Sequence, residues 1–303
     1  MPAPAAPVRP PLAILMLTLT ALMWAGNATA ARLAVGEVSP MLLTAARWTG
    51  ATLVLLPFTA RLVWADRAEI ARVWPFLLGL GATGFAGFNL LLYMAALTTT
   101  AVNITIIQAA MPMMIFAINL AAFAVPIRPL QVLGYVLTLG GVALVAGRGD
   151  LQSLARLEVA PGDALMLIAS VLYAVYTVAL KRPLALHSLS LLTVLCASAS
   201  LVSLPVAAFE AWRGGHVFTG TPLSLGVVAY TALLPSVMAQ WFFMLGVRAV
   251  GANRAGLFVN LVPVFGAVIA VAVLNEVLAP FQIVALGMVL GGILIAQASG
   301  GRG

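Results

Sequence analysis

PMMIFAINLAAFAVPIRPLQVLGYVLTLGG at residues 112–141 and PVFGAVIAVAVLNEVLAPFQIVALGMVLGG at residues 263–292 are two copies of one pattern. Each copy holds a proline in an apolar run, a break at a Pro-x-Gln step, and a second apolar run closed by a glycine pair. A shift of 151 residues superposes the landmarks, which are Pro112 on Pro263, Pro129 on Pro280, Gln131 on Gln282, and Gly140–Gly141 on Gly291–Gly292. Such a repeat indicates that the chain consists of two similar units.

Composition places both units in a membrane. Of 303 residues, 63% are hydrophobic and 8% are charged, and the mean hydropathy is +1.12. Soluble globular chains carry about 25% charged residues. Because a soluble core cannot cover this much apolar surface, we expect the lipid bilayer to surround the protein. The net charge of +7 does not indicate a nucleic-acid partner, because the basic residues lie singly between apolar runs instead of in patches.

The residues that ligate metals are scarce and scattered. Cys196 is the single cysteine, which excludes an intramolecular disulfide. His187 and His216 are far apart, and the chain has no HExxH motif. We therefore expect no metal site, no cofactor and no catalytic residues.

Ten apolar segments are long enough to cross the hydrocarbon as helices, which need about 20 residues each. They are predicted at 12–34, 40–63, 73–98, 101–124, 129–147, 163–184, 188–211, 222–247, 252–274 and 280–298. The predicted fold is all-α and polytopic. Its domains are a disordered leader at 1–11, a first repeat at 12–147, a loop at 148–162, a second repeat at 163–298 and a tail at 299–303.

The distribution of Lys and Arg predicts the orientation. With the N-terminus in the cytoplasm, ten basic residues fall on inside segments and four on outside segments, and Arg47 lies within the second span. Positive charge is retained on the cytoplasmic side. Both termini are therefore predicted to be cytoplasmic, in the inner (plasma) membrane.

Five spans per repeat is an odd number, so the second repeat enters the membrane inverted. At a shift of 149 residues Trp24 falls on Tyr173 and Asn27 on Tyr176. Inverted repeats are the architecture of many alternating-access transporters, which hold substrate near the midplane where the repeats meet. Channels also use inverted repeats, so this pattern favours a transporter without proving one.

These features resemble the EamA family of the drug/metabolite transporter superfamily. The residues that carry the resemblance are the two halves of five spans, the aromatic and small polar pair in each first span, and LNEVLAPFQIVALGMVLGGILI at 274–295. The first repeat departs from the pattern, with Val125 at the position of Glu276. The aromatic residues of spans 1 and 6 further resemble YddG-like amino-acid exporters. The resemblance implies a transport fold without identifying a substrate.

Polar and aromatic side chains inside the spans are the candidate substrate contacts, because polar groups avoid lipid and face protein or water. They are Trp24, Asn27, Asn89, Tyr93, Gln108, Tyr173, Tyr176, Gln240, Trp241 and Asn260. That these residues converge on one cavity is what the resemblance implies. Pro112 and Pro263 are candidate hinges, since proline removes a helix hydrogen bond.

Each candidate also has a structural interpretation. Amides often join membrane helices to one another, and Trp24 and Tyr93 could belong to an interfacial aromatic belt. The prolines could be kinks that packing tolerates. Arg47 could snorkel to the interface, or pair with a backbone carbonyl or a substrate carboxylate. The paired glycines are expected at close helix contacts, and Asp163 and Glu276 at span ends in contact with water.

No span centre carries an acidic residue, so a carboxylate proton relay has no candidate. A neutral cavity lined by amides and aromatic rings suits a zwitterion with an apolar body. The sequence therefore predicts a facilitator that exports small neutral metabolites, above all aromatic and other apolar amino acids. Alternatives are another drug or metabolite carrier of the superfamily, with nucleotide-sugar or sugar-phosphate transport less favoured, an intramembrane enzyme, or a scaffold without transport. The expected partners are a small-molecule substrate and the lipid bilayer, and the expected state is a monomer.

Overall fold

The predicted ten-span helical fold is confirmed by the computed structural model, which describes residues 10–123, 129–150, 159–215 and 217–298. Described residues form no strand, and one isolated β-bridge joins Val38 to Phe218. The spans are α1 (Pro10–Leu33); α2 (Pro40–Ala65); α3 (Arg67–Leu80), π-helix η1 (Gly81–Gly87) and α4 (Phe88–Ala95); α5 (Ala101–Ala109) and α6 (Met111–Phe123); α7 (Pro129–Ala146); α9 (Pro161–Ala179); α10 (Ser188–Trp212); α11 (Pro222–Leu233), η2 (Leu234–Met238) and α12 (Ala239–Val250); α13 (Ala252–Val259) and α14 (Val262–Leu274); and α15 (Pro280–Ala298).

The structure does not describe every segment that the sequence analysis delimits. Most of the predicted leader, the tail at 299–303 and the centre of the inter-repeat loop lie outside the described residues.

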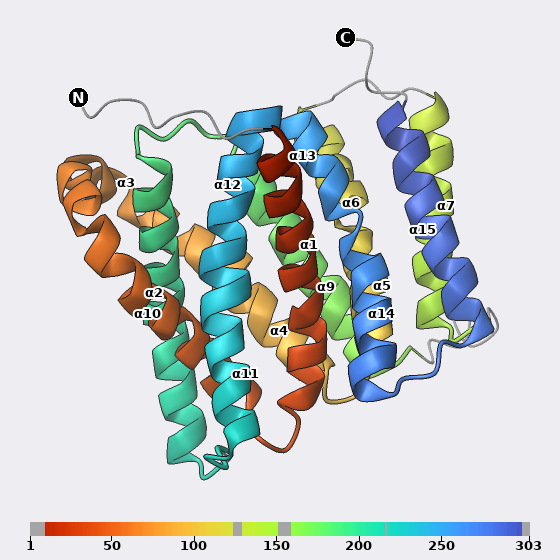
Figure 1. Ribbon diagram of the computed structural model, residues 1–303, viewed down its shortest axis with the longest axis horizontal. Coiled ribbons are helices and arrows are strands. Elements are labelled where there is room, and N and C mark those ends of the chain that lie inside the picture. The colour runs from red at the N-terminus through yellow and green to blue at the C-terminus, as the bar shows by residue number, and fades with distance from the viewer. Residues whose placement is uncertain (1–9, 124–128, 151–158, 216, 299–303) are drawn as a thin grey trace.

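The two five-span halves run in opposite directions. In Figure 1, α1 descends from the upper end of the molecule, whereas α9, the first helix of the second half, ascends. The start of α1 and the end of α15 lie at the same end. We call this the proximal end, and we call the opposite end, where α1 finishes and α5 begins, the distal end.

Helix boundaries repeat as closely as the sequence landmarks do. Helices α4, α5 and α6 begin 151 residues before α12, α13 and α14, and the π-helices η1 and η2 end 151 residues apart. Pro112 and Pro263 each stand second in the helix that follows a break. At these breaks the hydrogen bonds tighten to an i→i−3 pattern, from Ala110 N to Ile107 O (3.1 Å) and from Leu261 N to Phe258 O (3.0 Å). Proline lacks the N–H that would continue an α-helix.

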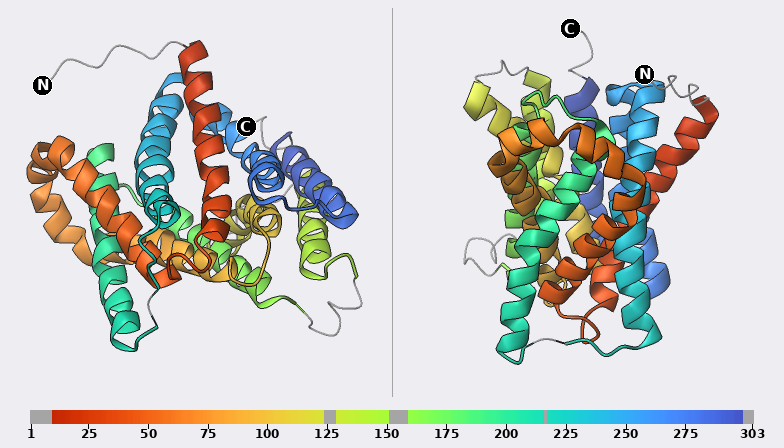
Figure 2. Two further views of the ribbon diagram at one scale, coloured as in Figure 1. Left: turned by 60° about the horizontal axis from the view of Figure 1, so that its bottom comes forward. Right: turned by 90° about the vertical axis from the view of Figure 1, so that its left-hand side faces the viewer.

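Helix packing interleaves the two halves. Helix α2 lies against α10, and α7 lies against α15, which pairs equivalent spans (Figures 1 and 2). Helix α1 packs on α12 and α14 of the other half, and α9 packs in the same way on α4 and α6. This exchange brings spans 1, 3, 4, 6, 8 and 9 together at the centre.

The expected role of the paired glycines in close packing is met at two positions. A Cβ on Gly141 would lie 2.8 Å from the Ala285 carbonyl oxygen, and one on Gly292 would lie 2.4 Å from the Gly134 carbonyl oxygen. Helices α7 and α15 can therefore approach this closely only with glycine there. A Cβ on Gly291 meets nothing within 4 Å, so this glycine is not at a close contact.

Two boundaries differ from the prediction by five or six residues, and the others lie closer. Helix α3 begins at Arg67 instead of residue 73. The polar residues before Val73 are also helical, and they continue into the span through a kink at Val73 (φ −118°, ψ 17°). Helix α9 ends at Ala179 instead of residue 184, since Pro183 disfavours helix in the residue before it and removes a donor.

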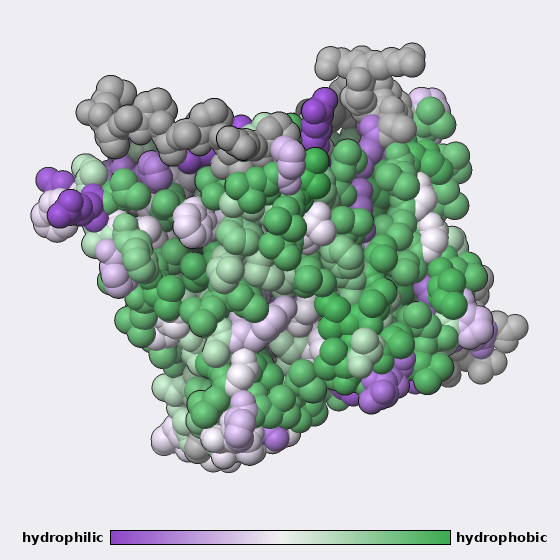
Figure 3. Space-filling view, viewed as in Figure 1, coloured by the Kyte–Doolittle hydropathy of each residue, from purple (hydrophilic) through white to green (hydrophobic). Residues whose placement is uncertain are grey.

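Large apolar side chains cover the outside of the bundle. Phe58 is 83% exposed, Leu53 is 64% exposed and Leu201 is 65% exposed. Figure 3 shows a mainly hydrophobic face, with hydrophilic residues gathered towards its upper and lower margins. This surface suits contact with lipid chains.

Candidate functional site

A cavity of about 160 Å³ lies where the two halves meet. Helices from both repeats line it, including both π-helical spans and both proline breaks. Its lining residues are Trp24, Asn27, Arg47, Trp48, Gly84, Phe85, Phe88, Asn89, Gln108, Ala109, Met111, Pro112, Ile115, Tyr173, Pro235, Gln240, Val259, Asn260, Val262, Pro263 and Ile293.

Most of the predicted site residues therefore lie together. Those that line the cavity are Trp24, Asn27, Asn89, Gln108, Tyr173, Gln240 and Asn260, with the predicted hinges Pro112 and Pro263 and the charged Arg47. Tyr93 is buried behind this lining and bonds to it. Tyr176 is buried against Phe85, with ring centroids 5.6 Å apart. Trp241 is 49% exposed and does not line the cavity.

Arg47 is the centre of a buried polar cluster. Its Nε donates to Ser236 Oγ at 2.7 Å. Its Nη1 lies 2.7 Å from Asn27 Oδ1, 2.8 Å from Asn89 Oδ1 and 2.7 Å from Tyr93 OH. Arg47 therefore joins α2 to α1, α4 and η2. It does not snorkel, because only 4% of its surface is exposed.

The π-helical turns position two members of this cluster. Ser236 belongs to η2, and its hydroxyl also donates to Thr231 O, five residues earlier, at 2.8 Å. Asn89 follows η1 by two residues and donates to Phe85 O at 2.9 Å. A π-turn inserts one residue into a helix and re-aims the side chains around it, which is why such turns are common at functional sites.

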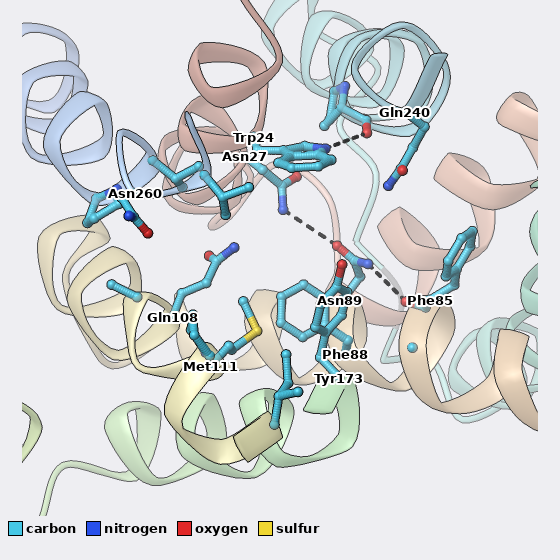
Figure 4. A pocket seen from close by; sticks show the side chains of 18 of the residues that line it. Trp24, Asn27, Phe85, Phe88, Asn89, Gln108, Met111, Tyr173, Gln240 and Asn260 are labelled. Carbon is cyan, nitrogen blue, oxygen red and sulfur yellow. Dashed lines mark hydrogen bonds between the residues drawn. The ribbon is translucent and has the colours of Figure 1, made fainter. Parts of the chain in front are cut away.

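Aromatic rings form much of the remaining wall (Figure 4). The Trp24 indole donates to Pro235 O at 3.2 Å, which fixes the ring on the cavity side of α1. Phe88 and Tyr173 pack with their centroids 5.1 Å apart. Trp48 stacks on Phe85 at 4.6 Å, and the Arg47 guanidinium carbon lies 4.8 Å from the Trp48 ring centroid.

Two amides in the wall are available to a ligand. Gln108 points into the cavity from α5 in Figure 4, and Gln240 comes from α12 across it. Within the described residues neither side chain has a hydrogen-bond partner. Asn260 completes this side and makes one long bond, to Gln297 Oε1 at 3.4 Å. These groups can donate to an anion or accept from an ammonium.

Several site residues escaped the sequence analysis. Ser236, Trp48, Phe85, Phe88 and Met111 are ordinary residues for a membrane helix, and single-span patterns do not separate cavity from core. One usable signal was present, since Gly81, Gly84 and Gly87 recur every third residue in the π-helical turn. A Cβ on Gly84 would lie 2.1 Å from the Tyr176 ring, so glycine is required there.

A second polar cluster closes the distal end. Thr99 Oγ1 donates to Asp163 Oδ1 at 2.5 Å, and Asn103 Nδ2 lies 3.3 Å from the same oxygen. Gln282 Nε2 donates to Asn103 Oδ1 at 2.7 Å. The expectation that Asp163 contacts water is wrong, because its surface is 0% exposed. Its position in the first turn of α9 places it against Thr99 of the α4–α5 connection and Asn103 of α5 instead.

Glu276 is only partly buried, and it caps a helix. Its carboxylate accepts bonds from Ala101 N (2.9 Å) and Val102 N (3.2 Å) at the start of α5. A carboxylate at a helix N-terminus satisfies free donors and complements the helix dipole. In the described residues no cluster of His, Cys, Asp and Glu has the makeup of a metal site.

An inverted-repeat bundle whose central cavity is lined by amides, aromatic rings and Arg47 is typical of membrane carriers. The chain belongs to the EamA-like transporter family, which matches twice, at residues 11–147 and 160–297.

Three curated relatives are similar over most of their length. The threonine/homoserine exporter RhtA of Escherichia coli K12 is 24% identical over 94% of this chain and 90% of its own. A probable terminal-alkyne amino-acid exporter of Streptantibioticus cattleyicolor is 25% identical over 93% and 92%. The uncharacterized transporter YyaM of Bacillus subtilis is 26% identical over 88% and 87%. A solved crystal structure covering 97% of this chain, at 20% identity and a TM-score of 0.64, shares the fold.

Proposed function

We propose that this protein exports small neutral metabolites, above all amino acids with aromatic or other apolar side chains, across the plasma membrane. The observation that carries the proposal is the central cavity, whose wall combines aromatic rings from both repeats with Gln108 and Gln240, whose amides bond to no described residue. Amides can bond the ammonium and carboxylate groups of a zwitterion, while rings contact its body. The names of two relatives, a threonine/homoserine exporter and a probable terminal-alkyne amino-acid exporter, support amino acids as substrates.

The proposed mechanism is alternating access. The halves rock about the cavity, with α5–α6 and α13–α14 bending at the breaks before Pro112 and Pro263. Such motion carries one site from one face of the membrane to the other. Membership of a transporter family argues against the alternatives of an intramembrane enzyme and a scaffold.

The proximal end is proposed to face the cytoplasm, because it carries the excess of Lys and Arg. Single cysteines in a Cys196→Ser background test this orientation. Ala185→Cys lies at the proximal end and Gly215→Cys at the distal end, and both positions are exposed. An impermeant thiol reagent outside intact cells should label only Gly215→Cys, and the reverse pattern would invert the topology.

Counterflow in proteoliposomes tests transport. Purified protein should exchange labelled amino acids, with phenylalanine among the best substrates and threonine included because of the exporter relatives. Trp24→Ala and Gln240→Ala should each reduce exchange by on the order of tenfold, since each loses a direct solute contact. Trp241→Ala is the matched control, because this residue neighbours Gln240 but lies outside the cavity.

Two results would contradict the proposal. An absence of exchange for every amino acid tried would remove the function. Unchanged exchange in both Trp24→Ala and Gln240→Ala would remove the site.

A further inference from the structure

Arg47 is a buried cation, and no acidic residue in the described part of the chain pairs with it. A guanidinium stays protonated in proteins, and this one is 4% exposed within a membrane-spanning helix. Of the eight acidic residues, all but Glu158 lie in the described part of the chain, and none of those pairs with Arg47. Charges at membrane depth are costly, and they mark interior or water-filled sites. The described residues therefore leave the charge of Arg47 without a counter-ion.

The neighbours of Arg47 hold it without neutralising it. Its acceptors are the neutral oxygens of Ser236, Asn27, Asn89 and Tyr93, and they occupy Nε and Nη1 alone. The third nitrogen, Nη2, has two N–H groups and no hydrogen bond to any described residue. The Arg47 side chain lines the central cavity. The bonds to Nε and Nη1 thus fix the orientation of the guanidinium, while the two N–H groups of Nη2 stay available to a ligand.

Hydrogen bonds to neutral oxygens orient the guanidinium, but they do not offset the desolvation of a buried cation as a negatively charged partner would. Arginine offers a rigid, planar fork that matches a carboxylate in shape and charge. The cavity wall on the other side supplies Gln108, Gln240 and Trp24, which can hold the rest of a small solute.

We propose that Arg47 binds the carboxylate of the transported solute, and that the substrates are therefore small monocarboxylates, zwitterionic amino acids among them. This inference rests on the proposed function, and it adds which chemical group a substrate must carry. Amines and carboxyl esters lack the anion and are excluded, whatever their apolar body. A zwitterion places its ammonium towards the amide and aromatic wall, whose oxygens and ring faces attract a cation.

Competition with the wild-type protein tests the anchor without any substitution. Phenylalanine, 3-phenylpropionate, phenethylamine and phenylalanine methyl ester share one aromatic body and differ in their charged groups. In phenylalanine counterflow the two carboxylates should compete, and the amine and the ester should be weaker by on the order of tenfold or more. Equal competition by phenethylamine would overturn the proposal.

Substitutions locate the effect at one side chain. Arg47→Gln should raise the half-saturating concentration for phenylalanine on the order of tenfold and abolish the preference for carboxylates over phenethylamine. Arg47→Lys should retain part of that preference, because it keeps the charge but loses the fork. Arg72→Gln, at an exposed ion pair, is the control. A merely structural Arg47 would change activity but leave the preference intact, which would refute the anchor.

Thermal shift of the purified protein separates this inference from the proposed function. If phenylalanine and 3-phenylpropionate raise the Tm of the wild type while phenethylamine does not, the anchor stands even without measurable transport. If amines and carboxylates are exchanged equally, the protein is a transporter and the anchor is wrong. Should Arg47→Gln fail to fold, the wild-type competition decides alone.

Discussion

Helices α5 and α13 occupy the same place in the two repeats, and they are packed very differently. In α5 every residue from Ala101 to Ile107 is buried. In α13, which starts 151 residues later, Ala255 is the buried residue among those whose side chains are described. Figure 1 places α5 towards the distal end and α13 at the proximal end. The equivalent helices are thus packed tightly at the distal end, where α5 begins, and loosely at the proximal end, where α13 lies.

Polar residues account for the difference. The start of α5 is capped by Thr100 Oγ1, which accepts from Asn103 N at 3.1 Å, and by the Glu276 carboxylate. Helix α13 begins after Gly251 (φ 86°) with no side-chain cap. The repeat partner of Glu276 is Val125, which lies outside the described residues and has no acceptor in its side chain. In the proposed alternating-access mechanism, such differences between the two ends would set the relative free energies of the two states.

The largest effect is expected from the buried acid of the distal cluster. Asp163→Ala leaves the Thr99 hydroxyl without its acceptor and the Asn103 amide with only its 3.3 Å bond to Thr99 Oγ1, which should cost about 3 kcal/mol. Thermal unfolding in detergent measures the change. Asp163→Asn is the control and should cost less, because it keeps an oxygen for Thr99. Equal, small losses in both variants would show that the distal cluster does not hold that end closed.

An intermediate effect is expected from the helix cap. Glu276→Gln should weaken two bonds to the α5 N-terminus by about 1.4 kcal/mol, which favours a distal-open state roughly tenfold. Labelling of Ala109→Cys, a cavity position, by an impermeant reagent from the distal side measures that state in a Cys196→Ser background.

The proximal counterpart sharpens this test. Asn119→Ala removes the 2.6 Å bond from Lys181 Nζ that joins the turn after α9 to α6. A partly exposed contact of this kind is weak, so labelling from the distal side should change less than about threefold. If Asn119→Ala and Glu276→Gln act equally, the two ends do not differ as their packing suggests.

The smallest effect is expected at the exposed rim of the distal end. Thr219 and Thr221 donate to Glu37 and hold the pKa of its carboxyl below the usual range. Its contribution is therefore present above the unfolded pKa of about 4.3 and is lost as the pH falls through the lowered value. Glu37→Gln should lower the Tm at pH 7 by at most about 1 °C, and less near pH 3. A drop as large as that of Asp163→Ala would contradict the ranking.

The sequence by itself determined the membrane class, the ten spans, the repeat and most of the polar residues that line the cavity. These follow from the length, repeat and polarity of the apolar segments. Every span in lipid must be a helix, and polar side chains must face the inside of the bundle. Trp24, Asn27, Gln108 and Gln240 could therefore be named in advance. Trp241 could not be separated from them, since its neighbour Gln240 faces the cavity and it does not.

Only the tertiary structure decided which polar residues meet. Arg47 was ambiguous in sequence because its partners Asn27, Asn89 and Ser236 come from three other spans, and the π-turns that aim two of them leave little trace in composition. Asp163 stands at a span end in the sequence, yet the connections that fold over it bury it completely. Hydropathy is a property of one segment, whereas burial and hydrogen bonding depend on segments that the chain brings together from far apart.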